Sequence, residues 1–445
     1  MTKKGFSIVE IVLAAALFAI FSVGAVGLVV KGLEANRLAA EQAIANQFAA
    51  EGLEMARAVR NQNFSGLSGF SGTNNTFEKY TRTIAYTSVD ADTYKITSTV
   101  SWAVTAGRNN SVVLNTYLTN WRKAIATIGN WANPNSLAGT LDLTGTQAGL
   151  KIAVSGSYAY VIRAISGGAN FLVINISNPA SPILAGSLTT TGTPADIFVA
   201  GNYAYLSTND SNAELKIINI TNPAAPSLAS AFNLPGNTQT TGVYVLGTTA
   251  YLSRNASSQN EFYIINVSNP TSPSITGSLN LSASTNDVKV LGNYAFLATA
   301  NTIQQLQVIN ITIPAAPTLA GSVQLGTVAA TKLELATGLA VVSAGSNVYL
   351  VNISTPTTPS QTGVYAAGGA VNDLSLGNNN TYAFLATSNT ASELQVLDIS
   401  NPASPSLVGI YNDTGNYNGI AYDGSSDRVY AATSITTGEV RVIAP

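Results

Sequence analysis

The chain has 445 residues, enough for more than one domain, and it contains neither histidine nor cysteine. Charged residues make up only 9% of it, and the formal net charge is −2. This composition excludes a disulfide framework, the commonest general base, the thiol nucleophile and the preferred ligands of zinc and copper. We therefore expect a non-enzymatic protein with no cofactor and no metal site.

Charge is distributed unevenly along the chain. Residues 1–132 contain 12 Lys/Arg and 8 Asp/Glu, a net charge of +4, whereas residues 133–445 contain 8 Lys/Arg and 14 Asp/Glu, a net charge of −6. Nucleic-acid affinity depends mainly on neutralising phosphates, which the acidic larger part is poorly suited to do. We expect no nucleic-acid partner.

The N-terminal segment Lys3–Val30 is a short basic leader, a glycine and a long apolar run that a single acid, Glu10, interrupts. A carboxylate within a membrane-length segment costs about 2.5–3.5 kcal/mol on insertion scales, so it requires a partner or a function. A secretory signal would place its small residue after the apolar run, and here Gly5 precedes it. A plain membrane anchor fits the length but leaves Glu10 unexplained.

With its sequence KKGFSIVE, this segment resembles the leader of type IV prepilins. The resemblance implies that residues 1–5 are a leader, that a prepilin peptidase cuts after Gly5, and that the new terminal amine, on Phe6, is methylated. It also implies that Glu10 meets the terminal amine of a neighbouring pilin during assembly. Two groups that are costly to bury alone can neutralise each other in a lipid-like filament core.

A continuous helix is predicted over residues 6–60. The apolar run continues without proline into a segment where apolar residues recur at helical spacing among Glu, Gln, Arg and Asn. The first half of the helix would lie in a membrane or filament core, and the second half would pack on a globular head. The Gly-, Ser- and Asn-rich segment 61–75 ends it.

Three strand-like runs follow, at Phe77–Ser88, Thr93–Val104 and Asn109–Thr119, and turn residues separate them. They predict a small antiparallel sheet within residues 61–127. The whole of residues 1–122 resembles minor pilins of the PilV-like type, in which such a sheet packs on the helix. Trp102 and Trp121 are interpreted as packing residues.

The rest of the chain, residues 128–445, is a sevenfold repeat. Each repeat has a proline after a strand-ending motif such as SNP, and these prolines recur every 42 to 47 residues. Turn signals divide each repeat into four short runs, which is typical of a β-propeller blade. The aligned prolines are Pro134, Pro179, Pro223, Pro270, Pro314, Pro356 and Pro402.

The two ends of this region predict how the ring closes. The last repeat ends at GEVRVIAP after its third strand, and the segment Leu137–Leu143 precedes the first full repeat. We expect this segment to supply the missing fourth strand, which would hide two strand edges. The motifs FLVINISNPASP and LQVLDISNPASP resemble the LVIVD-repeat propellers, and the fifth repeat departs most from the pattern because it is short between strands and has leucine in place of tyrosine.

Three acids at the start of innermost strands, Asp196, Asp287 and Asp373, are the only candidate ligand-binding ring in the propeller. Such acids at one mouth of the channel could bind a cation or a sugar, or support glycosidase chemistry. The alternative is that each one caps its local turn by accepting backbone N–H groups. The turn Asp423–Asp427 has too few closely spaced oxygens to indicate a calcium site.

The fold class predicted is mainly β, with one long N-terminal helix, a small sheet and a seven-bladed propeller. The function predicted is a minor pilin that displays the propeller for adhesion to a glycan or protein, after residence in the bacterial inner membrane as a precursor. One alternative is a pseudopilin-like component that caps assembly or contacts cargo in a secretion or DNA-uptake apparatus. Another is a surface carbohydrate-active enzyme.

Overall fold

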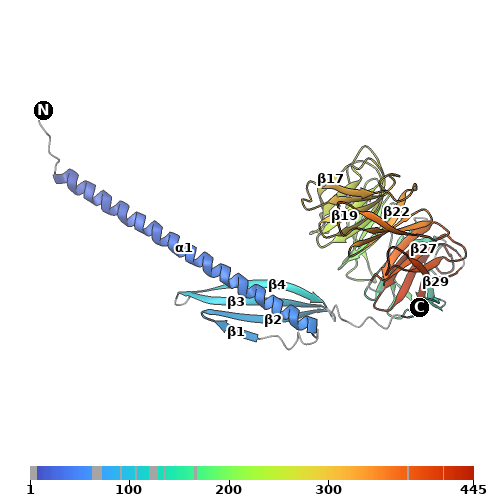
Figure 1. Cartoon of the computed structure of the whole chain (residues 1–445), viewed down its shortest axis with the longest axis horizontal. Coiled ribbons are helices and arrows are strands. Elements are labelled where there is room, and N and C mark those ends of the chain that lie inside the picture. The colour runs from blue at the N-terminus through green and yellow to red at the C-terminus, as the bar shows by residue number, and fades with distance from the viewer. Residues whose placement is uncertain are drawn as a thin grey trace. The chain divides into compact units, whose positions relative to one another are not determined.

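The computed structural model describes residues 8–62, 73–90, 93–105, 108–119, 129–134, 136–143, 145, 147–164, 168–377, 380–413 and 415–445. It contains two compact units, residues 1–124 and 125–445. One long helix and many four-stranded antiparallel sheets make the chain mainly β, which confirms the predicted fold class. Figure 1 shows both units in chain order.

The first unit consists of helix α1 (Ile8–Gln62) and a four-stranded sheet in the order β1-β2-β3-β4. The helix is about 80 Å long at 1.5 Å per residue. The strands are β1 (Thr73–Phe77), β2 (Tyr80–Asp90), β3 (Thr93–Thr105) and β4 (Arg108–Thr119). The C-terminal half of α1 packs on this sheet, as Figure 1 shows.

The prediction of three strands in this sheet is wrong in one place. The run expected at Phe77–Ser88 is interrupted by a two-residue turn, since Phe77 pairs with Tyr80 across a hairpin. Glu78 in that turn has a left-handed φ of 52°. The first three residues of the additional strand β1 fall in the predicted loop 61–75, because the sequence of β1, TNNTF, is rich in asparagine, which strands usually avoid.

Helix and sheet meet through a small apolar core with one buried acid. Ala45, Ala49 and Ala56 of α1 are fully buried, which lets the helix backbone approach the sheet closely. Glu41 is 6% exposed, accepts a hydrogen bond from Trp102 Nε1 at 2.9 Å and forms an ion pair with Lys79. The interpretation of Trp102 as a packing residue is consistent with this position.

The second unit is a seven-bladed propeller. The innermost strands neighbour one another in cyclic order from β6 through β30 and back to β6, so the ring is closed. Blade one is β6 (Gly149–Ser155), β7 (Tyr158–Arg163), β8 (Phe171–Asn175) and β9 (Ile183–Leu188). Blade two is β10 (Pro194–Ala200), β11 (Tyr203–Thr208), β12 (Leu215–Asn219) and β13 (Ser227–Phe232).

The next three blades repeat this order from the axis outward. Blade three is β14 (Thr240–Leu246), β15 (Thr249–Arg254), β16 (Phe262–Asn266) and β17 (Ser274–Leu279). Blade four is β18 (Thr285–Leu291), β19 (Tyr294–Thr299), β20 (Leu306–Asn310) and β21 (Thr318–Val323). Blade five is β22 (Ala330–Ala336), β23 (Leu339–Ala344), β24 (Asn347–Asn352) and β25 (Ser360–Ala366).

The last two blades complete the circle. Blade six is β26 (Val371–Gly377), β27 (Tyr382–Thr387), β28 (Leu394–Asp398) and β29 (Ser406–Tyr411). Blade seven is β30 (Tyr417–Asp423), β31 (Arg428–Thr433), β32 (Val440–Ala444) and, from the start of the unit, β5 (Ser136–Leu141). Strand β5 pairs antiparallel with β32, so the predicted closure by the segment before the first repeat is confirmed.

Neighbouring blades pack closely against each other at a glycine in the outermost strand. A Cβ on Gly186 of blade one would lie 2.3 Å from the carbonyl oxygen of Pro223, in the Asn-Pro turn of blade two. A Cβ on Gly409 would likewise lie 2.1 Å from the carbonyl oxygen of Trp131. The absent side chain therefore lets the turn of the next blade rest on the strand, which explains the recurring Gly in these strands.

Candidate functional site

The three predicted acids occupy one register position around the axis of the propeller. In every innermost strand a β-bulge separates the first residue from the third, so the third residues are structurally equivalent. We call these seven positions the axial ring. Its members are Lys151, Asp196, Gly242, Asp287, Lys332, Asp373 and Gly419.

The carboxylates of the axial ring connect successive blades. Asp196 Oδ2 accepts a hydrogen bond from the backbone N–H of Val243 in blade three at 3.0 Å, and Asp287 Oδ2 accepts one from Leu333 in blade five at the same distance. Asp373 Oδ2 accepts one from Ile420 in blade seven at 2.9 Å. The expectation that each acid caps its own turn is wrong: the partners lie in the next innermost strand, and Asp287 Oδ1 accepts one further hydrogen bond, from the next residue of its own strand.

Two lysines in the axial ring balance these acids. Lys151 of blade one forms an ion pair with Asp373 of blade six, reaching past blade seven. Gly419 permits this contact, because a Cβ there would lie 2.7 Å from the Cα of Lys151. Sequence reasoning missed both lysines, although alignment of the innermost strands places Lys151 and Lys332 in the same register as the acids.

Burial and neighbouring charge shift the pKa values within the ring. Desolvation raises the pKa of Asp196, although Lys332 and Lys151 oppose the rise. Desolvation also lowers the pKa of Lys151, and the Asp373 carboxylate opposes that shift. For Lys332 burial disfavours the charged form, but the surrounding carboxylates outweigh it and raise its pKa.

A second layer lies two residues further along the innermost strands. Lys289 of blade four and Glu334 of blade five form an ion pair with a nitrogen-to-oxygen distance of 2.9 Å. Phe198 and Tyr244 of blades two and three pack with ring centroids 4.8 Å apart. Opposite charges and paired rings therefore line the axis at this level. Within the described residues, no group of three or more acidic side chains is arranged to hold a metal ion.

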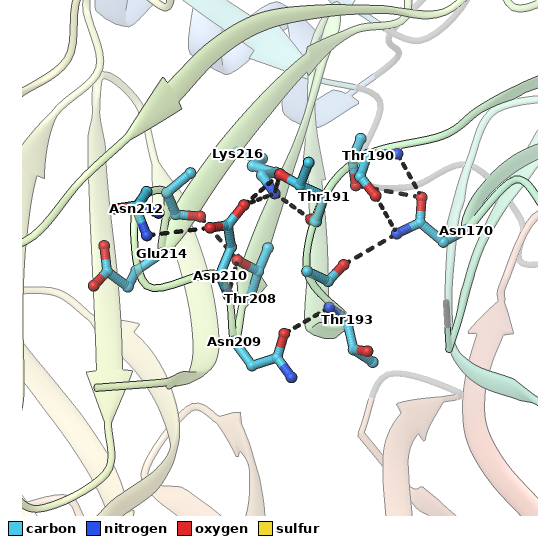
Figure 2. Close-up of polar contacts among 12 residues, drawn as sticks. Asn170, Thr190, Thr191, Thr193, Thr208, Asn209, Asp210, Asn212, Glu214 and Lys216 are labelled. Carbon is cyan, nitrogen blue, oxygen red and sulfur yellow. Dashed lines mark hydrogen bonds and ion pairs between the residues drawn. The ribbon is translucent and has the colours of Figure 1, made fainter. Parts of the chain in front are cut away.

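In blade two, a buried lysine connects two loops through hydrogen bonds. Lys216 is 1% exposed, and its Nζ donates to Asp210 Oδ2 at 2.7 Å and to Thr191 Oγ1 at 2.8 Å. The hydrogen bonds that Lys216 and Thr191 each donate to the Asp210 carboxylate lower its pKa to about 2. Figure 2 shows Lys216 between the loop that carries Thr191 and the loop that carries Asp210, so the lysine joins the two loops.

The turn at Asp423–Asp427 fastens the two ends of the propeller. Trp131 is 1% exposed and packs edge-on against Phe384 with centroids 4.7 Å apart. Its Nε1 donates to Asp427 Oδ1 at 2.9 Å, and the backbone N–H of Gly129 donates to Asp427 Oδ2 at 2.6 Å. Sequence reasoning assigned a turn here but missed this contact between residues nearly 300 positions apart.

The predicted processing and assembly residues are only partly within the described structure. Gly5 and Phe6 lie outside the described residues. Glu10 belongs to helix α1, but its side chain also lies outside the description. The segment Ala15–Arg57 contains a stretch long and apolar enough to span a membrane, with a mean hydropathy of 2.1, and none of that stretch is buried.

The fold of the second unit defines the class of protein, a β-propeller, and five segments of its sequence match the LVIVD repeat. The LVIVD repeat family matches residues 149–190, 191–233, 238–280, 282–324 and 368–413. These ranges cover blades one to four and blade six. No match was found among curated proteins.

Solved propellers resemble the structure at low sequence identity. The β-propeller domain of Cps50 (Swd1) from Myceliophteria thermophila is 10% identical, with a TM-score of 0.53 over 68% of this chain and 98% of that one. The RRP9 WD40 repeats are 12% identical, with a TM-score of 0.54 over 70% and 98%. A functionally unknown protein from Desulfotomaculum acetoxidans is 15% identical, with a TM-score of 0.52 over 70% and 94%. At these identities the similarity concerns the fold alone.

Proposed function

We propose that this protein is a minor pilin of a type IV pilus or related filament, and that its propeller is an extracellular adhesion module. The observation that carries the proposal is the uncovered apolar surface of helix α1. Val12, Phe18, Phe21 and Leu28 are each more than 60% exposed, and exposed apolar side chains continue to Leu33. A soluble monomer rarely exposes a contiguous apolar surface of this extent, so a lipid or a partner helix is required to cover it.

The two halves of α1 differ in the burial and polarity of their side chains, and this difference supports the proposal. The half that packs on the sheet buries Ala45, Ala49 and Leu53 and carries charged residues on its other faces. Between Glu10 and Lys31 the helix carries no charged residue. A helix that is half membrane-like and half amphipathic fits a subunit that leaves the inner membrane and joins a bundle of like helices. Other pilins and a prepilin peptidase are then its partners.

The propeller contributes a stable display platform. The ring is closed by its own strands, and the acids that could have supported hydrolysis bond to neighbouring blades. This arrangement supports binding as the activity, although a propeller alone does not specify a ligand. A glycan or protein on another surface is the proposed target.

The proposal can be tested in the native host. Intact-mass analysis should show a mature chain that begins with N-methylated Phe6. The substitution Glu10→Gln should preserve membrane insertion, because it removes a charge from the apolar segment, but should reduce incorporation into filaments. Deletion of residues 129–445 should abolish attachment while filaments persist. Retention of residues 1–5 together with normal incorporation of the Glu10→Gln variant would contradict the proposal.

A further inference from the structure

Blade five differs from the other blades at the loop between its second and third strands. Only two residues, Gly345 and Ser346, separate β23 from β24, and Ala344 pairs with Asn347 across them. In blade two, by comparison, residues 209–214 separate β11 from β12. In blade two this longer loop contacts the start of the innermost strand, since the N–H of Asn209 donates to the carbonyl oxygen of Thr193 at 3.1 Å, and the fifth repeat has no loop of that length.

A cavity of about 430 Å³ occupies the space beside this short hairpin. Besides Gly345, its lining comes from the second residues of four consecutive innermost strands and from the start of blade six. These residues are Thr331, Asn372, Asn418, Leu150, Ala370 and Val371. The cavity thus lies directly before the axial ring, where blades five, six, seven and one converge, and its volume falls within the usual range for small-molecule sites.

Two asparagines give the cavity its polar chemistry. Asn372 Nδ2 donates to the carbonyl oxygen of Tyr417 at 2.8 Å, and Asn418 Nδ2 donates to that of Gly149 at 2.8 Å. Each bond fixes the orientation of its amide. Among the described residues neither Oδ1 atom accepts a hydrogen bond, so two acceptors with fixed positions remain for a ligand.

The rest of the lining is uncharged. Leu150, Ala370 and Val371 provide apolar contact, and Thr331 provides a hydroxyl that also bonds to Ser343 at 2.9 Å. A ligand with hydroxyl donors on one side and a C–H face on the other satisfies both kinds of lining. An anion would meet two amide oxygens and no cationic side chain in this lining.

We propose that this cavity binds one uncharged sugar ring. Hydroxyl groups of the sugar donate to Oδ1 of Asn372 and Asn418, and its C–H face packs on Leu150 and Val371. The inference rests on the proposed adhesive function, for which it supplies the ligand class. A site for a single ring binds weakly, and many filament-displayed copies supply avidity.

The test is saturation-transfer NMR on the full chain in detergent, with a panel of soluble neutral monosaccharides and uronic acids as the probes. At least one neutral monosaccharide should receive saturation, and uronic acids should receive less. Ala370→Trp should abolish the signal by filling the cavity. Asn372→Ala should weaken binding about tenfold, the effect of losing one buried hydrogen bond.

Asn286→Ala is the matched control for Asn372→Ala. Asn286 occupies the same register position in blade four, and its Nδ2 donates to the Ala330 carbonyl oxygen at 2.6 Å. Both variants lose an equivalent bond between blades and should melt at similar temperatures, but Asn286 does not line the cavity and its variant should bind normally. Equal losses of binding in the two variants would overturn the assignment, as would the lack of saturation for every neutral sugar.

Attachment assays separate this inference from the proposed function. If deletion of residues 129–445 abolishes attachment while no sugar binds, the cavity assignment is wrong and the adhesive role stands. If the chain binds a sugar through Asn372 but the deletion leaves attachment unchanged, the cavity assignment stands and the adhesive role is wrong.

Discussion

Helix α1 and the propeller differ in how far their apolar side chains are exposed. Side chains such as Phe21, which is 78% exposed, have no cover along the first half of the helix. In the propeller, side chains of the same kind, such as Phe384 and Phe296, are at most 1% exposed and lie between blades. Among the described residues, the propeller therefore buries its apolar side chains within one chain, whereas the first half of the helix leaves its apolar side chains exposed.

The largest expected effect comes from opening the propeller. A truncated chain that starts at Thr144 lacks both β5 and Trp131, so β32 becomes an exposed edge. Loss of the buried Trp131 alone should cost about 3–5 kcal/mol, and the total should exceed that. Calorimetry should show a much lower melting temperature, with aggregation, relative to a chain that starts at Gly129. Equal melting temperatures would show that the ring does not depend on its closure.

The next effect concerns the charges of the axial ring. Asp373→Asn keeps an acceptor for the N–H of Ile420 but leaves the buried ammonium of Lys151 without its carboxylate, which should cost about 3–5 kcal/mol in the free energy of unfolding. Adding Lys151→Met should recover most of this loss. Denaturant titration of the single and double variants measures it.

Asp398→Asn is a suitable control for the axial ring, because asparagine occupies the equivalent strand end in blades one and two, at Asn175 and Asn219. This control should change stability little. A cost of Asp373→Asn that matches the control would mean that the buried ion pair contributes nothing.

A smaller effect is expected at the junction of helix and sheet. The hydrogen bond from Lys79 holds the pKa of Glu41 below its usual value. A lowered pKa stabilises the fold above the pKa of the unfolded chain, and this contribution disappears as the pH falls through the folded value. The first unit should therefore loosen in acid, as followed by amide hydrogen exchange in strands β2 to β4, and Glu41→Gln should flatten this pH dependence. An unchanged acid transition in the variant would assign the effect to other groups.

The smallest effect concerns a repeated buried position before the third strand of a blade. Glu214 Oε2 accepts from the N–H of Leu234 at 2.9 Å, and Gln305 Oε1 accepts from Leu325 at 2.8 Å, so the two residues perform the same task. Gln305 Nε2 also donates to the carbonyl oxygens of Gly326 and Val328, whereas Glu214 Oε1 has no partner among the described residues.

Burial raises the pKa of Glu214, so the folded state favours the neutral acid. Its contribution to stability is complete below the unfolded pKa and declines as the pH rises toward the folded value. Glu214→Gln should therefore raise the melting temperature at neutral pH by about 2 °C, on the order of 1 kcal/mol, and Gln305→Glu should lower it similarly. Shifts of the same sign in the two variants would contradict this account.

The sequence predicts most of this architecture because repetition makes the pattern explicit. Seven aligned prolines define the blades, and the unequal ends predict the closing strand. The single strand expected at Phe77–Ser88 was wrong because a two-residue turn without Gly, Pro or Asn leaves little local signal.

The site was less predictable than the fold because its contacts cross between blades. The three acids were identified, but their partners lie in the next blade, 46 or 47 residues away. The contact of Trp131 with Asp427 joins residues at opposite ends of the unit. Neither kind of contact leaves a pattern in the nearby sequence, so both could be identified only from the structure of the closed ring.

The most direct test of the central claim is the location of the propeller on intact cells. The chain has no cysteine, so Ser268→Cys, in an exposed turn of blade three, introduces a unique thiol. A membrane-impermeant gold maleimide, imaged by electron microscopy, should label intact cells on filaments when helix α1 carries the chain into them. Labelling only after the cells are broken would contradict the account.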